Sequence, residues 1–428
     1  RPITDEDRNM LMEHSAGMAK QALRVLALAY RSLGKDEVAE HKEAMLRGRS
    51  ELTFIGLMGM IDPPRPEARP AVDLCKRAGI KVIMCTGDHK LTAQAIAAEI
   101  GILEEGDEVI TGEEIDGMNR DDLDAIVDRA AVFARVSPEH KYRIVVSLRD
   151  RGEIVAMTGD GVNDAPALKA ANVGVSMGIT GTDVTKETAD MVLTDDNFAT
   201  IVSAVEEGRV IFENIRKVLR YLVATNTGEV ITILSALILL PAAPLILTPI
   251  MILYINLVTD GLLDKTLAVE PGEKNIMDVP PRPPDAKLIN AELIRNVIFV
   301  GALMSIGTLF MFDRALATGD ERKAITMAFA TMAMFQVFNA MNCRSRTQSI
   351  FQLGPFSNKY LVISLIAAPV LLFLATYLEA FQAGMGTVAL AAGDWAAVVL
   401  VSSTILVVEE VRKYIRRRMN ERDFPAPV

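Results

Sequence analysis

The hydrophobic and polar positions change their pattern near residue 215 and divide the chain into two parts. In the first part, short apolar runs alternate with amphipathic stretches of roughly ten to fifteen residues. The apolar runs predict strands at 81–84, 131–133, 153–157, 173–175 and 191–193. The stretches between them include predicted helices at 91–100, which Gly101 ends, and at 138–150. Strands that alternate with helices in this way predict βαβ units and a parallel sheet.

The second part consists of long apolar stretches. They predict six membrane spans, at about 218–241, 246–269, 296–316, 324–343, 359–379 and 394–415. The segment 197–240 passes from polar to apolar without a proline, so we expect one continuous helix there. At about 1.5 Å per residue this helix would be roughly 65 Å long, enough to leave the first part and cross a bilayer. The chain is therefore expected to be a multi-pass membrane protein with the lipid bilayer as a partner.

Basic residues suggest the orientation of these spans. They cluster after the second span, around the loop after the fourth and after the sixth: Lys274, Arg282, Lys287, Arg295; Arg344, Arg346, Lys359; Arg412, Lys413, Arg416, Arg417, Arg418. By the positive-inside rule these segments and both chain ends would be cytoplasmic. The loop after the third span weakens the signal, because it holds Arg314, Arg322 and Lys323.

Composition narrows the class of protein further. The chain has 428 residues and a formal net charge of −10, which argues against a nucleic-acid partner. Its three cysteines show no paired spacing, so neither a disulfide framework nor a zinc site is predicted. The chain begins at Arg1 without a signal-like segment, and we expect it to be a piece of a longer protein.

The candidate chemistry of the first part centres on the run from Met157 to Pro166, M-T-G-D-G-V-N-D-A-P. It follows a predicted buried strand and places Asp160, Asn163 and Asp164 in a glycine-rich turn. Open α/β domains bind ligands at this edge of the sheet. Two carboxylates there favour Mg²⁺, which keeps waters and substrate phosphates as further ligands. The alternative is that the two aspartates cap the helix that begins near Ala165.

The same run resembles the signature of the P-type ATPases, ion pumps that form an aspartyl-phosphate. Three more pieces agree in order and spacing: Asp62-Pro63-Pro64-Arg65, Thr86-Gly87-Asp88, and Arg135 with Lys141. The resemblance implies an α/β haloacid-dehalogenase-like (Rossmann-like) phosphorylation domain followed by an all-α six-helix transmembrane bundle. The implied divisions are the tail of a nucleotide-binding domain at 1–50 and the phosphorylation domain at 51–200. A stalk with the first span follows at 197–241, then the other five spans at 242–418 and a cytoplasmic tail at 419–428.

The resemblance also implies roles for single residues. Asp160 and Asp164 would hold Mg²⁺, and Asn163 and Asp164 would contact the phosphoryl group. Lys141 would neutralise charge on the transferring phosphoryl, and Thr86 would donate a hydrogen bond to it. These residue types suit phosphoryl transfer, which depends on positioning and electrostatic stabilisation. Taken alone, Lys141 would be read as a solvated surface lysine.

The remaining residues implied for the site are Gly87 and Asp88, which complete the Thr86 turn, and two arginines. Arg24 and Arg135 would bind the nucleotide, with Mg·ATP as the substrate. A Thr-Gly-Asp turn after a strand is often only a turn. For Arg24 the alternative is an exposed position on an amphipathic helix.

Polar residues inside the first two spans predict a cation site. Asn226 and Glu229 are three residues apart and would share a helix face, as would Asn256, Thr259 and Asp260. Ionisable residues at membrane depth are functional by default, and oxygen ligands suit a hard cation such as Ca²⁺. The alternative is a cluster of interhelical hydrogen bonds.

The segments N-T-G-E and N-L-V-T-D-G, which carry these residues, resemble the calcium pumps of the sarcoplasmic-reticulum type and their bacterial relatives. The resemblance implies Ca²⁺ as the transported ion and a bacterial cell membrane as the location. Two-site pumps have a glutamate where this chain has Gln336. Because an amide is a weaker Ca²⁺ ligand, we expect one Ca²⁺ per ATP.

Several parts of such a pump are absent from the sequence. The first part has no D-K-T-G-T motif for the acceptor aspartate, and the actuator loop and the proline-rich transport helix are also missing. Asp264-Lys265-Thr266 is not the acceptor, because no Gly-Thr follows it and it lies in the second span. We therefore expect the N-terminal half of the pump as a partner, and expect no pumping by this piece alone. The alternatives are a pump for Mn²⁺ or Na⁺, or a naturally short, non-catalytic membrane protein that binds Mg²⁺ or a partner.

Overall fold

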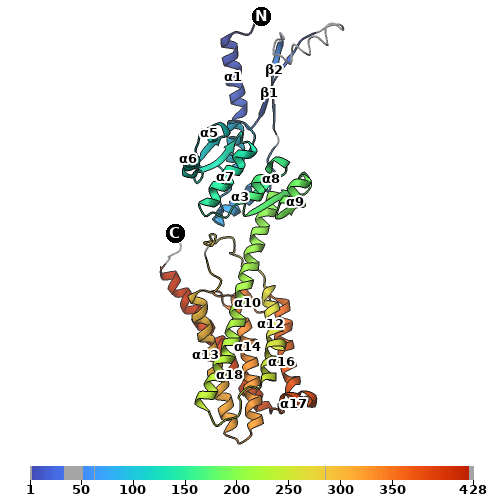
Figure 1. The fold of residues 1–428 in the computed structure, drawn as a ribbon, viewed down its shortest axis with the longest axis vertical. Coiled ribbons are helices and arrows are strands. Elements are labelled where there is room, and N and C mark those ends of the chain that lie inside the picture. Colours follow the sequence, from blue (N-terminus) through green and yellow to red (C-terminus); the bar gives the residue numbers. More distant parts are fainter. Residues whose placement is uncertain (1, 33–51, 62, 285, 424–428) are drawn as a thin grey trace. The chain divides into compact units, whose positions relative to one another are not determined.

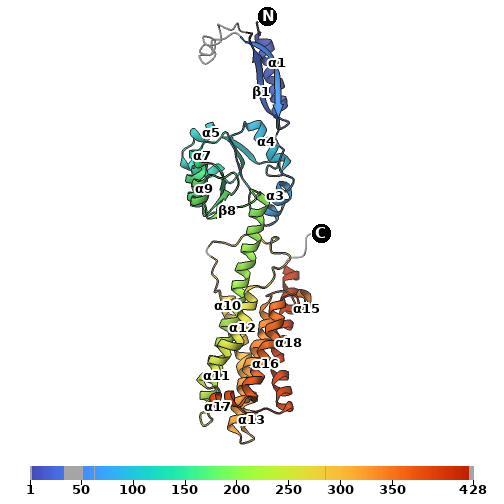
Figure 2. The ribbon, with the colours of Figure 1, turned by 90° about the vertical axis from the view of Figure 1, so that its right-hand side faces the viewer.

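The computed structural model describes residues 2–32, 52–61, 63–284 and 286–423 (Figures 1 and 2). Two compact units make up the chain. The first unit comprises Arg1–Glu206 and Asn275–Asp285, and the second comprises Glu207–Lys274 and Ala286–Val428. Asp62 and residues 33–50 of the predicted nucleotide-domain tail lie outside the described residues.

The first unit is built from short strands and helices. In chain order these are α1 (Asp5–Ala19), β1 (Arg24–Tyr30), β2 (Thr53–Met60), α3 (Ala68–Arg77), β3 (Met84–Cys85), α4 (Lys90–Glu99), β4 (Glu108–Thr111), α5 (Gly112–Asp116), α6 (Arg120–Ile126), β5 (Ala130–Ala134), α7 (Pro138–Asp150), β6 (Ala156–Gly159), the 3-10 turn η2 (Val162–Asp164), α8 (Ala165–Ala170), β7 (Val173–Met177), α9 (Asp183–Thr188) and β8 (Met191–Leu193). The alternation of strands and helices confirms the predicted α/β class.

The strands form one antiparallel pair and two parallel sheets. β1 pairs with β2 in antiparallel fashion, while the parallel sheets have the orders β3-β5-β4 and β6-β7-β8. All five residues of β5 are buried, as expected for the central strand of a parallel sheet. The predicted strand at 81–84 is paired only from Met84 onward, and β6 begins at Ala156 instead of residue 153. Strand assignment requires a ladder of paired residues, and the ladders begin at Met84 and Ala156. Before β6 the Val155 carbonyl accepts from the Val173 amide of β7 at 3.1 Å.

Helix α7 shows how local sequence sets an element boundary. It begins after Ser137, whose hydroxyl accepts a hydrogen bond from the amide of His140 at 3.3 Å, and Pro138 occupies its first turn. A serine cap followed by proline is a strong start signal for a helix. The predicted helix at 138–150 is therefore confirmed at both ends.

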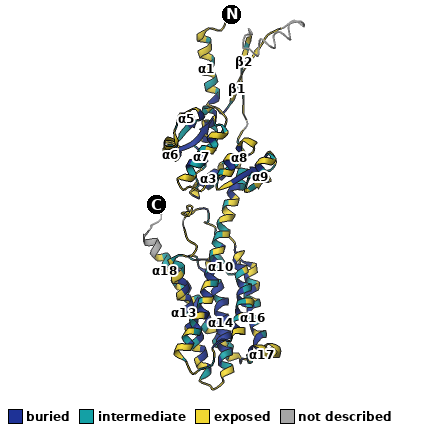
Figure 3. Ribbon diagram, in the orientation of Figure 1, coloured by how far each residue is buried: buried dark blue, intermediate teal, exposed yellow. Residues whose placement is uncertain are grey.

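The second unit is helical. Its elements are α10 (Phe198–Leu239), α11 (Pro249–Tyr254), the π-helical turn η3 (Ile255–Asp260), α12 (Gly261–Ala268), α13 (Ala291–Leu316), α14 (Glu321–Cys343), α15 (Ile350–Leu353), α16 (Lys359–Tyr377), α17 (Glu379–Met385) and α18 (Ala392–Asp423). Helix α10 begins in the first unit and is uninterrupted over 42 residues, as predicted for 197–240. Helix α14 is the most buried of the long helices and packs against α13 and α18 (Figure 3).

Five helices in the described residues are long and apolar enough to cross a membrane. They are α10, α13, α14, α16 and α18 up to Arg418. The predicted second span, 246–269, is helical but is not a single α-helix. A π-helical turn separates α11 from α12 and contains Asn256, Thr259 and Asp260. Such turns hydrogen-bond from i to i+5 and occur frequently at functional sites.

Candidate functional site

The clearest polar pair of the first unit joins Lys141 to Asp164. The Lys141 ammonium donates to Asp164 Oδ1 at 2.7 Å, and the Gly161 amide donates to Asp164 Oδ2 at 3.3 Å. Asp164 is buried. A Cβ at Gly159 would lie 2.5 Å from the Cβ of Asp164, so only glycine fits there. The turn therefore fixes the Asp164 carboxylate in one position and balances its charge with Lys141.

The predicted Thr86 turn lies at the carboxyl end of β3. Thr86 donates to the Asp88 carboxylate at 3.1 Å and accepts from the Asp88 amide at 3.1 Å. The Thr86 amide donates to the Phe133 carbonyl, and the Arg135 amide donates to the Asp88 carbonyl. Arg135 is exposed and has a positive φ of 51°. These bonds tie the turn to the end of β5 and keep the Thr86 hydroxyl within it.

Cys85 links this turn to the Lys141–Asp164 pair, and the sequence analysis missed it. Burial raises the pKa of the Cys85 thiol to about 12, while the charge of Lys141 lowers this pKa and that of Asp164 raises it. The Cys85 thiol therefore lies within electrostatic range of both charged groups of the pair. Cys85 directly precedes Thr86 in the sequence, and this position could have identified it as a neighbour of the predicted site.

Asp160 and Asn163 are the exposed members of the predicted site. The Asp160 carbonyl accepts from the Thr182 amide at 3.0 Å, which ties this turn to the start of α9. Across the described part of the chain, no group of three or more His, Cys, Asp and Glu side chains could hold a metal. The pair Asp160 and Asp164 still fits Mg²⁺, because this ion takes one or two carboxylates and fills its other positions with water and phosphate.

The loop that reaches Asp160 is held by a second residue that the sequence analysis missed. The Asp196 carboxylate accepts from the amides of Gly178, Ile179 and Thr180, at 2.7, 3.0 and 2.8 Å. The hydrogen bond from Ile179, with those of the neighbouring groups, lowers the pKa of Asp196 to about 2. An aspartate that follows a strand and precedes a helix was a recognisable signal for such a bond.

Arg24 is the first residue of β1, is exposed, and pairs with Met60 of β2. The alternative that placed it on an amphipathic helix is wrong, because this segment is extended. Its predicted contact with a nucleotide stays a prediction.

In the second unit, four predicted residues form one hydrogen-bonded group, here called the Glu229 cluster: Glu229, Asn256, Thr259 and Gln336. Gln336 Nε2 donates to Glu229 Oε1 at 2.9 Å, and Asn256 Nδ2 reaches Glu229 Oε2 at 3.4 Å. The Thr259 hydroxyl lies 3.1 Å from Gln336 Oε1. Helices α10 and α14 and the π-helical turn thus contribute to one buried polar site.

Asp260 lies in the same turn but has its own partners. The Tyr221 hydroxyl donates to Asp260 Oδ1 at 2.7 Å, and the Thr225 hydroxyl donates to Oδ2 at 3.0 Å. Neither donor was predicted. Tyr221 and Thr225 precede Glu229 by eight and four residues, a spacing that places them on one helix face. That spacing was the signal that the sequence contained.

Asn226 is not brought to these residues. It is exposed, and its side-chain amide donates to the Leu222 carbonyl of its own helix at 2.7 Å. The face of α10 that carries Glu229 continues through Thr225 instead, which lies four residues earlier.

The chemical capacity of the Glu229 cluster and Asp260 follows from their donors. Glu229 and Asp260 are 4% and 2% exposed, and the hydrogen bonds to both carboxylates come from uncharged side chains. Two buried carboxylates without a basic partner are unfavourable unless a cation or protons balance them. Carboxylate, amide and hydroxyl oxygens are the ligands of hard cations.

Comparison with known proteins adds two family matches. Residues 244–415 match the family described as "Cation transporting ATPase, C-terminus", and residues 5–172 match "haloacid dehalogenase-like hydrolase".

Several curated proteins are similar to nearly the whole chain. "Calcium-transporting ATPase 1" of Bacillus cereus is 44% identical over 433 residues, which cover 97% of this chain and 48% of that protein. "Calcium-transporting ATPase" of Bacillus subtilis is 45% identical, with 90% and 43% covered, and "Calcium-transporting ATPase 1" of Saccharomyces cerevisiae is 38% identical, with 98% and 44% covered. The chain therefore spans about half the length of these relatives.

Proposed function

Because the chain belongs to the cation-transporting P-type ATPases, we propose that it is the C-terminal part of a pump that moves Ca²⁺ across a membrane at the expense of ATP. The observation that carries the proposal is the pair Glu229 and Asp260, buried among uncharged donors in the membrane part. The names of the relatives support Ca²⁺ as the ion.

The first unit would supply part of a phosphoryl-transfer site. Mg²⁺, bound by Asp160 and Asp164, would neutralise charge on the phosphoryl group. Lys141 is held by Asp164 at 2.7 Å and would neutralise charge on the transferring phosphoryl. Thr86 would donate to the same group after it releases Asp88, and Asn163 lies exposed beside the metal ligands. Arg24 and Arg135 are proposed ligands of ATP.

The acceptor aspartate is proposed to come from a segment outside this sequence. Within the described residues, β3 pairs with β5 alone and β6 pairs with β7 alone, so each is an edge strand there. Cys85 at the end of β3 is within electrostatic range of Lys141 and Asp164, and Asp164 follows β6 by five residues. A strand added at either edge would end beside these residues, where its carboxylate could be phosphorylated. The half-length match to the relatives supports such a missing segment.

We propose that residues 1–50 are the tail of a nucleotide-binding domain and residues 51–200 the phosphorylation domain. The stalk with the first span would be 197–241, the other spans 242–418 and the tail 419–428. Asn256, Thr259 and Gln336 would bind Ca²⁺ together with the two carboxylates. Asn226 would join only after releasing the Leu222 carbonyl. Since Gln336 adds no charge, one Ca²⁺ per ATP is proposed.

The protein is an integral membrane protein, and we propose that both ends of this chain face the cytoplasm of a bacterial cell, where basic residues gather. The test is ATP-dependent phosphorylation of the complete native protein in inside-out vesicles, with Ca²⁺, Mn²⁺ or Na⁺ as the only transported cation. Phosphoenzyme that forms with Ca²⁺, with Ca²⁺ uptake that Glu229→Gln abolishes, supports the proposal. Phosphorylation that needs Mn²⁺ or Na⁺ instead would redirect it to that ion, and no phosphorylation at all would favour a non-catalytic membrane protein.

A further inference from the structure

A pocket lined by arginines opens between the start of α13 and the end of α18. Its volume is about 450 Å³, and its lining residues, here called the arginine pocket, are Glu292, Arg295, Asn296, Arg412 and Arg416. Helices α13 and α18 pack against each other within the second unit. The pocket lies far along the sequence from the residues proposed to bind Ca²⁺ and shares none of them.

The pocket has an excess of positive charge. Three of its five lining residues are arginines, and Glu292 is the one acidic member. Glu292 forms ion pairs with Arg416 and also with Arg346, which lies outside the lining. Arg295 is exposed and forms no ion pair within the described residues. Glu292 is therefore shared between two arginines, and a third remains available to an anion.

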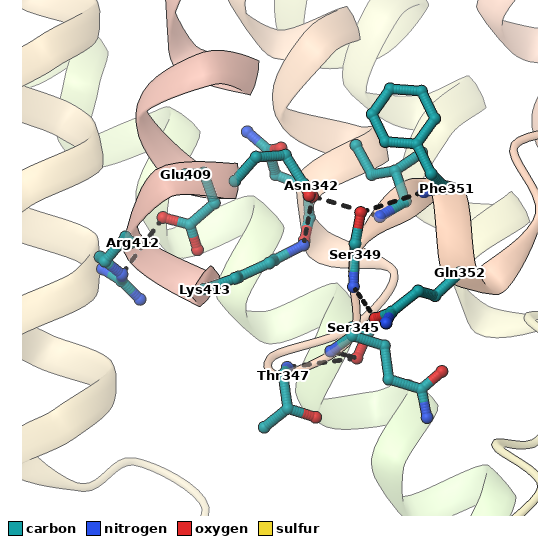
Figure 4. Close-up of polar contacts among 12 residues, drawn as sticks. Asn342, Ser345, Thr347, Ser349, Phe351, Gln352, Glu409, Arg412 and Lys413 are labelled. Carbon is teal, nitrogen blue, oxygen red and sulfur yellow. Dashed lines mark hydrogen bonds and ion pairs between the residues drawn. The ribbon is translucent and has the colours of Figure 1, made fainter. Parts of the chain in front are cut away.

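The arginines are held in place by neighbouring groups. Arg412 Nε lies 3.3 Å from Glu409 Oε2 (Figure 4), and its guanidinium lies 5.8 Å from the centre of the Phe299 ring. With its amide oxygen toward Arg412, Asn296 accepts from both terminal nitrogens, at 2.6 and 2.5 Å. Lys413, the next residue, points inward and donates to the Asn342 carbonyl at 3.2 Å (Figure 4). A guanidinium fixed in this way loses little freedom when it binds a phosphate.

The surroundings of the pocket favour an amphiphile over a free anion. Both helices are candidate membrane spans, and the pocket lies at their ends. Ile298 and Phe299 on α13, and Val411 and Ile415 on α18, are exposed apolar residues close in sequence to the lining. A ligand here would meet charge at one end and a lipid-facing surface beside it.

We propose that the arginine pocket binds the phosphate headgroup of an anionic phospholipid, with the acyl chains along the exposed apolar residues of α13 and α18. Basic pockets at the ends of membrane helices suit such headgroups, and each basic residue near the surface contributes about fivefold in affinity. The lipid would hold the two helix ends together, because its phosphate contacts arginines from both.

The test is native mass spectrometry of the complete protein in detergent, titrated with phosphatidylglycerol, phosphatidylcholine or glycerol 3-phosphate. We expect preferential retention of phosphatidylglycerol, weakened about fivefold by Arg295→Gln or Arg416→Gln. Arg417→Gln is the matched control, because Arg417 is the next residue on α18, donates to Gln352 and does not line the pocket. Glu292→Gln should bind phosphatidylglycerol more tightly, since it removes the only negative lining charge.

Three results would overturn the proposal. The first is equal retention of phosphatidylglycerol and phosphatidylcholine. The second is an Arg417→Gln effect as large as that of Arg416→Gln, which would assign the binding to diffuse charge on the tail. The third is retention of glycerol 3-phosphate as strong as that of the lipid, which would assign the pocket to a soluble anion. Unchanged thermal stability of each variant without added lipid separates lost binding from lost folding.

Discussion

Replacing Gln336 by glutamate tests whether the Glu229 cluster is organised around a cation. Gln336 Nε2 donates to Glu229 Oε1 at 2.9 Å, and both side chains are buried. Gln336→Glu removes the donor and places a second carboxylate against the first. A cation between them would turn this repulsion into a shared ligand set.

The size of the effect follows from this geometry. A hydrogen bond to a charged group contributes about 1.5–3 kcal/mol. Two charges about 3 Å apart repel by about 5 kcal/mol at an effective dielectric constant of about 20. Proton uptake relieves part of the repulsion, so we expect the cation-free variant to lose at least about 2 kcal/mol of stability. For a unit of this size that lowers the melting temperature by about 4–8 °C.

The assay is thermal unfolding of the complete protein in detergent, with a Ca²⁺ chelator or with saturating Ca²⁺. Gln336→Met is the matched variant, because it removes the same hydrogen bond without adding charge. Both variants should melt lower in chelator, and Ca²⁺ should restore Gln336→Glu by more than Gln336→Met. Loss of stability in neither variant, or equal responses to Ca²⁺, would refute the reasoning.

Three further predictions concern single side chains. Thr225→Val removes a hydrogen bond to Asp260 at 3.0 Å, and equilibrium Ca²⁺ binding should weaken by roughly tenfold or more; unchanged binding would separate Asp260 from the cation site. Gly159→Ala should abolish phosphorylation by ATP, because its Cβ would lie 2.5 Å from a neighbouring side chain, whereas Gly161→Ala, with its nearest atom at 3.7 Å, should retain it. Asp196→Asn should destabilise the first unit at neutral pH. Because the pKa of Asp196 is lowered from 3.8 to about 2, its contribution to stability is present above pH 4 and is lost as the pH falls toward 2. The difference in melting temperature between Asp196→Asn and the unsubstituted protein should therefore shrink on acidification. A difference that does not change with pH would contradict the assigned role.

Local signals predicted most of the first unit. The predicted start at Pro138 is confirmed for α7, and continuous apolar runs marked β5, β7 and β8. The start of β3 could not be predicted in this way, because residues 81–83 have the composition of a strand but form no strand pairing within the described part of the chain. Pairing is a tertiary property, which the apolar pattern of one segment does not contain.

For the candidate sites, too, local signals identified some residues, while contacts between distant segments determined the others. Glu229, Asp260 and Gln336 were predictable because charged and amide side chains are rare in apolar spans. Tyr221 and Thr225 were missed because hydroxyl residues are common there, although their spacing from Glu229 marks the same helix face. Asn226 was expected to join Glu229, but its side chain is satisfied by its own helix. The pairing of polar groups depends on how neighbouring helices pack, and the sequence of a single helix does not determine that packing.

The π-helical turn has a consequence for the phase of its helix. One row of buried positions in this span repeats every four residues: Met251, Ile255, Thr259, Leu263 and Leu267. In a straight α-helix of 3.6 residues per turn, such a row would drift by about 40° at each step and wind off the core. The wider turn takes up part of this drift, so apolar residues at both ends and the polar residues between them face the same interior. Deleting one residue from 255–260 would give a regular α-helix with its two ends nearly in the same phase, because a π-helical turn accommodates one extra residue. It would remove the wider turn that carries Asn256, Thr259 and Asp260.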